Sequence, residues 1–141
     1  MSASQLAALA RTADPHVVLR RFLALDALVT GVNGLAYLAV SGPLGDFLGV
    51  DSALLLGLGA FLLAYAAGVG VLAARGRPPA LAVRAVIEAN LAWVALSCLA
   101  HALWLTPSTA GGVWTVLQAA VVAGFALLQH MALRARQGSS E

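Results

Sequence analysis

Apolar residues are gathered into four long stretches, separated by short segments rich in glycine, proline or polar residues. The stretches cover about residues 17–40, 53–74, 80–105 and 113–133. Each approaches or exceeds the ~20 apolar residues that a helix needs to cross the hydrocarbon of a bilayer. Because the connections are short, consecutive helices run in opposite directions. The pattern predicts an all-α fold, an integral membrane four-helix antiparallel bundle.

The first stretch carries a polar stripe beside a strip of small residues. Asp26, Thr30, Asn33 and Tyr37 recur at spacings of four, three and four residues, which places them on one helical face. The small residues beside them are Ala27, Gly31 and Gly34. Because small residues let another backbone approach closely, we expect this face to pack on protein. Asp26 is then either the structural partner of an arginine or a carboxylate that binds a proton or cation.

The second stretch has no charged side chain and is expected to pack closely on another helix. Its small residues share one face and are Gly57, Ala60, Ala64, Ala67 and Gly68. The connection before it, 41–51, is rich in glycine, and we expect a short interfacial turn over 43–49. Asp51 or Ser52 is a suitable N-cap for the helix that follows.

The third stretch has two polar faces. One face holds Arg84 and Glu88, one helical turn apart, and is then continued by small or apolar residues. The opposite face holds Asn90, Trp93, Ser97, His101 and Trp104. Ionisable groups inside a membrane face protein or water, so we expect this helix to contact one or the other on more than one side. Arg84 and Glu88 form either a local ion pair near the headgroups or part of a functional site.

The charges also predict how the first and third stretches meet. An unpaired buried carboxylate is costly, so we expect these two helices to pack together on their arginine-rich half. Asp26 or Glu88 would then be bound by an arginine of the other helix. In the fourth stretch, Trp114, Gln118, Phe125 and Gln129 lie on roughly one face.

The distribution of arginine predicts the topology. All eight basic residues are arginines, and they occur near the N-terminus, within 75–84 or near the C-terminus, whereas 41–52 and 106–112 contain none. Under the positive-inside rule, both termini and the 75–79 turn are cytoplasmic. Residues 1–15 then form a short cytoplasmic N-terminal segment, 16–136 the transmembrane bundle and 137–141 a polar tail. The alanine-rich composition without lysine favours the inner membrane of a bacterium.

Composition argues against several other classes of protein. Of 141 residues, 61% are hydrophobic and 10% are charged, whereas about a quarter of a soluble domain is charged. The net charge of +2 comes from arginines beside apolar stretches, so we expect no nucleic-acid partner. The single cysteine, Cys98, excludes a CxxC pair and a cysteine metal cluster. We expect no cofactor, no bound metal and no enzymatic activity.

Polar residues of the first and third stretches make up a candidate intramembrane site, which comprises Asp26, Thr30, Asn33, Tyr37, Arg84, Glu88 and Asn90. The short connections and the lack of a catalytic motif favour a structural or accessory role. The alternative is an oligomeric transporter of a small solute or cation that uses Asp26 and Glu88. As partners we expect membrane lipid, and either a second copy of the chain or another membrane protein.

Overall fold

The computed structural model describes residues 2–3, 14–103 and 108–140. In this part of the chain the elements are helices: α2 (Pro15–Ala39), α3 (Ser41–Leu48), α4 (Ser52–Ala74), α5 (Ala80–Leu103) and α6 (Thr109–Ser140). Four of them, α2, α4, α5 and α6, are long and apolar enough to cross a membrane. This confirms the all-α fold with four membrane-length helices and indicates a multi-pass membrane protein. Trp104 and most of the expected N-terminal segment lie outside the described residues.

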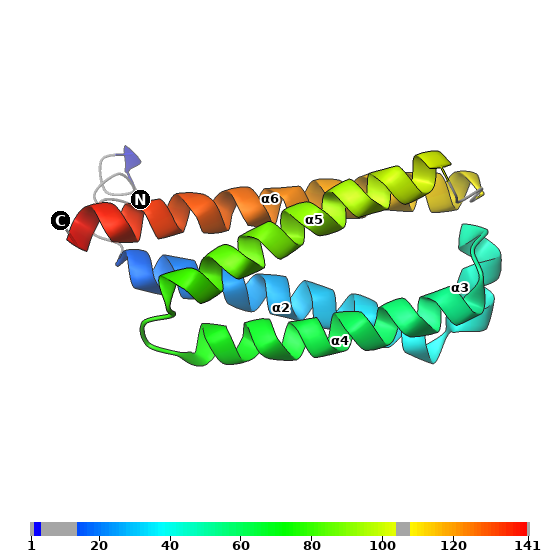
Figure 1. The fold of residues 1–141 in the computed structure, drawn as a ribbon, viewed down its shortest axis with the longest axis horizontal. Helices are drawn as coiled ribbons and strands as arrows, with labels where there is room; N and C mark the ends of the chain where they lie inside the picture. The colour runs from blue at the N-terminus through cyan, green and yellow to red at the C-terminus, as the bar shows by residue number, and fades with distance from the viewer. Residues whose placement is uncertain (1, 4–13, 104–107, 141) are drawn as a thin grey trace.

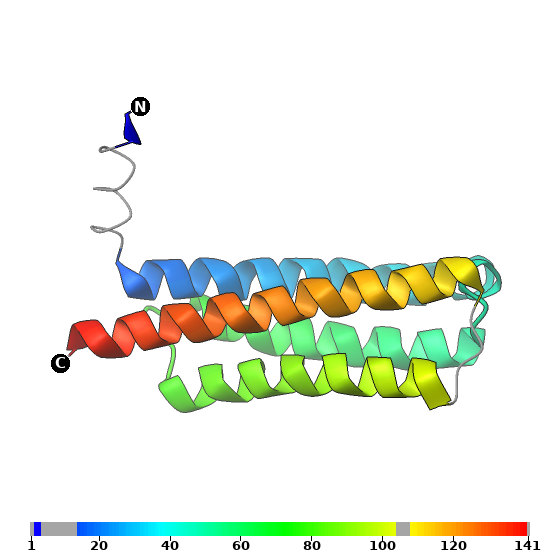
Figure 2. The same ribbon diagram turned by 90° about the horizontal axis from the view of Figure 1, so that it is seen from above.

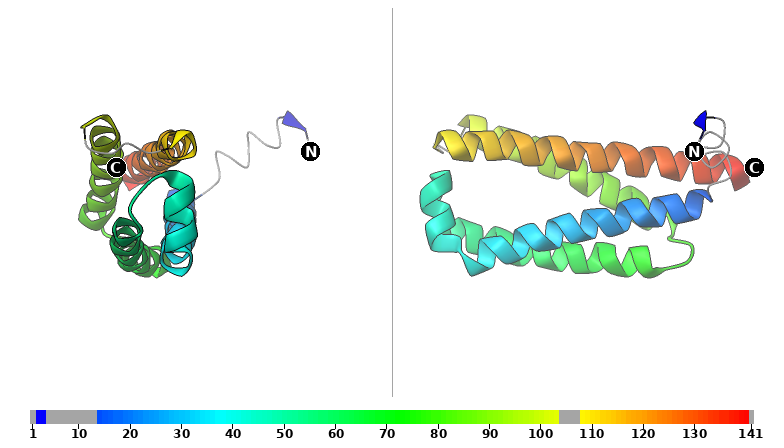
Figure 3. Two further views of the ribbon diagram at one scale, coloured as in Figure 1. Left: turned by 90° about the vertical axis from the view of Figure 1, so that its right-hand side faces the viewer. Right: turned by 180° about the vertical axis from the view of Figure 1, so that it is seen from behind.

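The four long helices are arranged as two hairpins that lie against each other (Figure 1). One hairpin pairs α2 with α4, and the other pairs α5 with α6. α2 also lies along α6 (Figure 2), whereas α4 and α5 scarcely touch. Seen end-on in Figure 3, α2 and α5 therefore occupy diagonal positions. The hairpins converge where α2 begins and α6 ends, here called the arginine end, and diverge toward α3, here called the α3 end.

Apolar side chains from all four long helices fill the arginine end. Leu19 and Leu23 of α2, both 0% exposed, pack in one cluster with Val83, Val86 and Ile87 of α5. Residues of α4 and α6 complete this cluster, among them Val69, Leu72, Ala126 and Leu133. Side chains of α2 and α5, the first and third stretches, therefore contact each other at the arginine end. The helices whose backbones lie close to α2 are instead α4 and α6.

Capping residues and arginines fix the helix ends at the arginine end. Asp14 accepts a hydrogen bond from the backbone N–H of His16 at 2.9 Å and caps α2. The Arg20 Nε group donates to the carbonyl oxygen of Ala73 at 2.9 Å, which satisfies an otherwise free carbonyl at the end of α4. Arg136 donates to the carbonyl oxygen of Pro78 in the α4–α5 connection. Two arginines therefore hold the connection between the hairpins against α2 and α6.

α2 and α4 approach each other closely where they cross at Gly34 and Gly59. A Cβ atom added at Gly34 would lie 3.0 Å from the carbonyl oxygen of Gly59, and one added at Gly59 would lie 2.9 Å from that of Gly34. The small-residue strip of the first stretch therefore packs as expected. The face expected for the second stretch does not: Gly57 and Gly68 have no neighbour for a Cβ within 4 Å. The contact instead uses the α4 face that carries Gly59, Leu62 and Ala66.

The connection between α2 and α4 is a helix rather than the expected turn. α3 covers Ser41–Leu48 and ends at Gly49, whose φ of 72° is in the left-handed region that favours glycine. Leu48 is buried, and the Ser108 hydroxyl at the start of α6 donates to the carbonyl oxygen of Phe47 at 2.7 Å. Tertiary contacts therefore stabilise this helix, which is too short and too rich in glycine to be stable in isolation. Asp51 caps α4, as expected, by accepting from the backbone N–H of Ala53.

Candidate functional site

A buried carboxylate lies at the centre of the polar residues in the interior. Asp26, on the inner face of α2, is 1% exposed. Its Oδ2 atom accepts hydrogen bonds from Asn90 Nδ2 of α5 at 2.8 Å and from Gln129 Nε2 of α6 at 2.7 Å. Its Oδ1 atom accepts from the hydroxyl of Thr30, one turn along α2, at 3.1 Å. Three donors thus satisfy the hydrogen-bonding oxygens of a carboxylate that has no access to water.

Tyr65 of α4 extends this network to the fourth long helix. Its hydroxyl donates to Asn90 Oδ1 at 2.9 Å, and Asn90 Nδ2 also donates to Gln129 Oε1 at 3.1 Å. We call Asp26, Thr30, Tyr65, Asn90 and Gln129 the polar cluster. Each long helix contributes at least one member, so the polar cluster joins both hairpins, one turn beyond the core of the arginine end.

The geometry of the polar cluster suits it to holding helices together. Every side-chain oxygen and amide nitrogen of Asp26, Asn90 and Gln129 has a partner within the cluster. In lipid an interhelical hydrogen bond contributes on average about 0.6 kcal/mol and up to about 1.7 kcal/mol. Several such bonds converge on Asp26, and they fix the rotation of each helix about its own axis, because a rotated helix would leave amides unpaired.

The structure corrects the expected partners of the two carboxylates. Asp26 is bound by two amides and a hydroxyl instead of an arginine. Arg84 and Glu88 are exposed on the outer face of α5, and neither forms an ion pair or hydrogen bond with the other or with another described residue. The reason is helical phase, since Glu88 lies about 200° around the helix from the inward-facing Asn90. Within the described chain, α5 therefore contacts protein on one side only.

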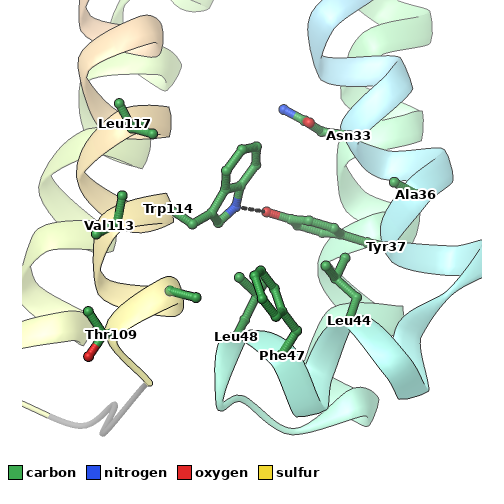
Figure 4. A pocket seen from close by; sticks show the side chains of 11 residues that line it. Asn33, Ala36, Tyr37, Leu44, Phe47, Leu48, Thr109, Val113, Trp114 and Leu117 are labelled. Atoms are coloured by element: carbon green, nitrogen blue, oxygen red, sulfur yellow. Dashed lines mark hydrogen bonds between the residues drawn. The ribbon is translucent and has the colours of Figure 1, made fainter.

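Asn33 and Tyr37 lie further along α2, beside a cavity. The Tyr37 hydroxyl accepts a hydrogen bond from Trp114 Nε1 of α6 at 2.7 Å, which links the two hairpins near the α3 end (Figure 4). Around this bond, α2, α3 and α6 enclose about 600 Å³, here called the α2–α6 cavity. Its lining is mostly apolar, with Leu48 and Val113 among the lining residues. The Asn33 amide points into it and has no hydrogen-bond partner among the described residues.

A second cavity, of about 370 Å³, lies on the other side of the Tyr37–Trp114 pair. It is bounded by α4, α5 and α6 and is called the α4–α5 cavity. Trp93 of α5 lines it and donates from Nε1 to Gln118 Oε1 at 2.6 Å. The ring of Phe61 stacks on that of Trp93, with their centroids 6.2 Å apart. Neither Asp26 nor Glu88 lines either cavity.

The structure therefore divides the candidate residues derived from the sequence into three groups. Asp26, Thr30 and Asn90 come together in the polar cluster, Asn33 and Tyr37 line the α2–α6 cavity, and Arg84 and Glu88 lie on the outer face of α5. The sequence did not identify Tyr65, Trp114, Gln118 and Gln129 as site residues. The available signal was a polar or amphipathic side chain within an apolar stretch, because such a group requires a partner there.

The described residues contain no group of three or more histidine, cysteine, aspartate or glutamate side chains that could hold a metal ion. Comparison of the chain with protein-family models, curated protein sequences and solved structures gives no match.

Proposed function

We propose that the chain is a bacterial inner-membrane protein whose four long helices form an antiparallel bundle with both termini in the cytoplasm. The arginines of the described residues support this orientation, because all of them lie at or near the arginine end. Arg21, Arg75, Arg77 and Arg134 are exposed there and are available to lipid headgroups. The α3 end has Asp46 and Asp51 but no described arginine or lysine.

Reporter fusions test this orientation. A reporter fused at Gly138, at the arginine end, is expected to give a cytoplasmic signal, and one inserted at Gly45 in α3 a periplasmic signal. Alkaline phosphatase and green fluorescent protein provide the two complementary measurements. Equal signals from both positions would contradict the orientation.

Within the membrane we propose an accessory role, the binding of one acyl chain of a membrane phospholipid. The observation that carries this proposal is the α2–α6 cavity, which lies between two membrane-length helices and has an apolar lining. Its volume of about 600 Å³ is within the usual range for ligand pockets, ~300–1,000 Å³. Lipid is the apolar ligand that surrounds such a cavity at all times, and filling it restores the dispersion contacts that an empty space lacks.

The polar groups of the cavity support a lipid that has an ester carbonyl. The unpartnered Asn33 amide lies six residues, or about 9 Å, from the end of α2, and offers a donor to that carbonyl. Because no described arginine lies at the α3 end, the site offers no basic partner to an anionic headgroup. We therefore expect zwitterionic and anionic phospholipids to be retained to a similar extent.

Native mass spectrometry of the detergent-purified protein tests the lipid site. The wild-type protein is expected to retain one phospholipid. Ala36→Phe and Ala110→Phe place a ring in the α2–α6 cavity and are expected to abolish retention, while Asn33→Leu is expected to lower it. Leu35→Phe is the matched control, because Leu35 is 57% exposed on the outer face of α2. A wild type without bound lipid, or retention by Ala36→Phe equal to the control, would contradict the proposal.

The alternative function, an oligomeric transporter of a small solute or cation, receives less support from the geometry. It requires Asp26 and Glu88 to reach a shared cavity, whereas Asp26 is enclosed by the polar cluster and Glu88 faces outward. Reconstitution into liposomes separates the two functions. Cation uptake by the wild type that is lost in Asp26→Asn or Glu88→Gln would favour transport, and the absence of uptake in all three is expected.

A further inference from the structure

We propose that two copies of this chain associate through the outer face of α5, with Arg84 of each copy paired with Glu88 of the other. The observation that requires a partner is the exposure of both charged side chains. Arg84 and Glu88 are exposed on a helix that is apolar and long enough to cross a membrane. Neither has an ion-pair partner among the described residues, although they are one helical turn apart.

The depth of Glu88 makes lipid a poor environment for it. Glu88 lies eight residues into α5, or about 12 Å from its start. Asn90, two residues further, is at the level of the buried carboxylate of Asp26. A glutamate side chain is too short to reach the headgroups from that depth, so an ionised carboxylate facing acyl chains carries a large free-energy cost. A cation on the neighbouring surface removes that cost.

The outer face of α5 is complementary to itself. Ala95, Cys98 and Ala102 share this face with Arg84 and Glu88 at 100° per residue, and all are exposed. Their small side chains allow a second helix to approach closely. One face therefore combines a base, an acid one turn away and room for another backbone, which is the pattern that an isologous contact requires.

Two-fold symmetry about an axis along the membrane normal produces the pairing. Two copies with the same membrane orientation place their α5 helices side by side in the same direction. Each Arg84 then lies about one turn, or about 6 Å along the axis, from Glu88 of the other copy. The contact contains two equivalent ion pairs, and it brings the two Cys98 side chains to the same depth. Another protein would need an arginine and a glutamate at the same spacing and depth, whereas a second copy of this chain has them because its sequence is the same.

The natural cysteine reports the contact. Oxidation of intact membranes with copper phenanthroline is expected to join the wild-type chain into a dimer through Cys98, and Cys98→Ser is expected to remove the dimer band. The matched control moves the cysteine to the outer face of α2, as Cys98→Ala with Leu28→Cys, since Leu28 is 62% exposed. This variant is expected to remain monomeric.

Charge variants test the pairing itself. Arg84→Glu and Glu88→Arg are each expected to lower the cross-linked fraction at least about tenfold, because each places like charges opposite one another. The exchange variant that combines both substitutions is expected to restore it, which also shows that the single variants act through charge. Arg134→Glu at the end of α6 is the control and is expected to leave it unchanged. A cross-linked fraction that does not change in Arg84→Glu, or no Cys98 dimer in the wild type, would overturn the proposal.

Discussion

Replacing Asp26 with leucine is expected to destabilise the protein strongly, while replacing it with asparagine is expected to have a small effect. Leucine removes the acceptor of Asn90 Nδ2 and Gln129 Nε2, which are both buried. A buried polar group left without a partner costs about 1–3 kcal/mol. Gln129 Nε2 loses its acceptor, and Asn90 Nδ2 keeps only its bond to Gln129 Oε1. We therefore expect a loss of about 2–4 kcal/mol, below the sum of two full penalties, because groups freed in a membrane also find other partners. Asparagine retains one carbonyl oxygen, which accepts from both amides.

Thermal unfolding followed by circular dichroism in detergent measures the difference. Asp46→Leu is the matched control, because Asp46 is an exposed acid on α3, and it is expected to leave the unfolding midpoint nearly unchanged. A stabilising role of the polar cluster would be wrong if Asp26→Leu unfolded at the same temperature as this control. It would also be wrong if Asp26→Asn destabilised the protein as much as Asp26→Leu.

Gly34→Leu is expected to separate α2 from α4 and to lower the free energy of unfolding by about 1–3 kcal/mol or more, as overpacking does. Even a Cβ atom there would lie 3.1 Å from the backbone nitrogen of Leu63 and 3.0 Å from the carbonyl oxygen of Gly59. These backbone atoms belong to a packed helix, and moving them disrupts the neighbouring contacts of Tyr37 and Leu62.

Gly57→Leu is the matched control for this substitution. Gly57 lies in α4, two residues before Gly59, and a Cβ there would meet nothing within 4 Å. Leucine is favoured over glycine in a helix by up to about 1 kcal/mol, so the control is expected to be neutral or stabilising in the same thermal measurement. Equal destabilisation by Gly34→Leu and Gly57→Leu would contradict the close helix crossing.

The sequence predicts the elements of this fold well, because each long helix has a strong local signal. The lengths of the apolar stretches predict four membrane-length helices, and Asp51 predicts the start of α4. The spacing of Asp26, Thr30, Asn33 and Tyr37 correctly indicates that this face of α2 turns inward, since all four are buried or half-buried. These predictions depend only on helix geometry and on residues close together in the chain.

The predictions that failed depend on how helices are rotated relative to one another. α5 offers both Arg84 and Asn90 as partners for Asp26, and only tertiary packing decides that Asn90 faces inward. α4 likewise offers two small-residue faces, and the crossing with Gly34 selects the one that carries Gly59. The sequence predicted a turn in place of α3, because a glycine-rich segment has weak helix propensity. The contacts that stabilise α3 come from residues of α6 about 60 positions away in the chain.

Quenching of Trp114 fluorescence by brominated phospholipid tests the acyl-chain site most directly, because Trp114 lines the α2–α6 cavity. The protein is prepared with Trp93→Phe and Trp104→Phe, so that Trp114 is the only tryptophan, and is reconstituted into phosphatidylcholine brominated on its acyl chains. An acyl chain in the cavity predicts strong quenching that falls when Ala36→Phe fills the cavity and is unchanged by Leu35→Phe on the outer face. Quenching of equal strength in the Ala36→Phe and Leu35→Phe proteins would contradict the presence of an acyl chain in the cavity.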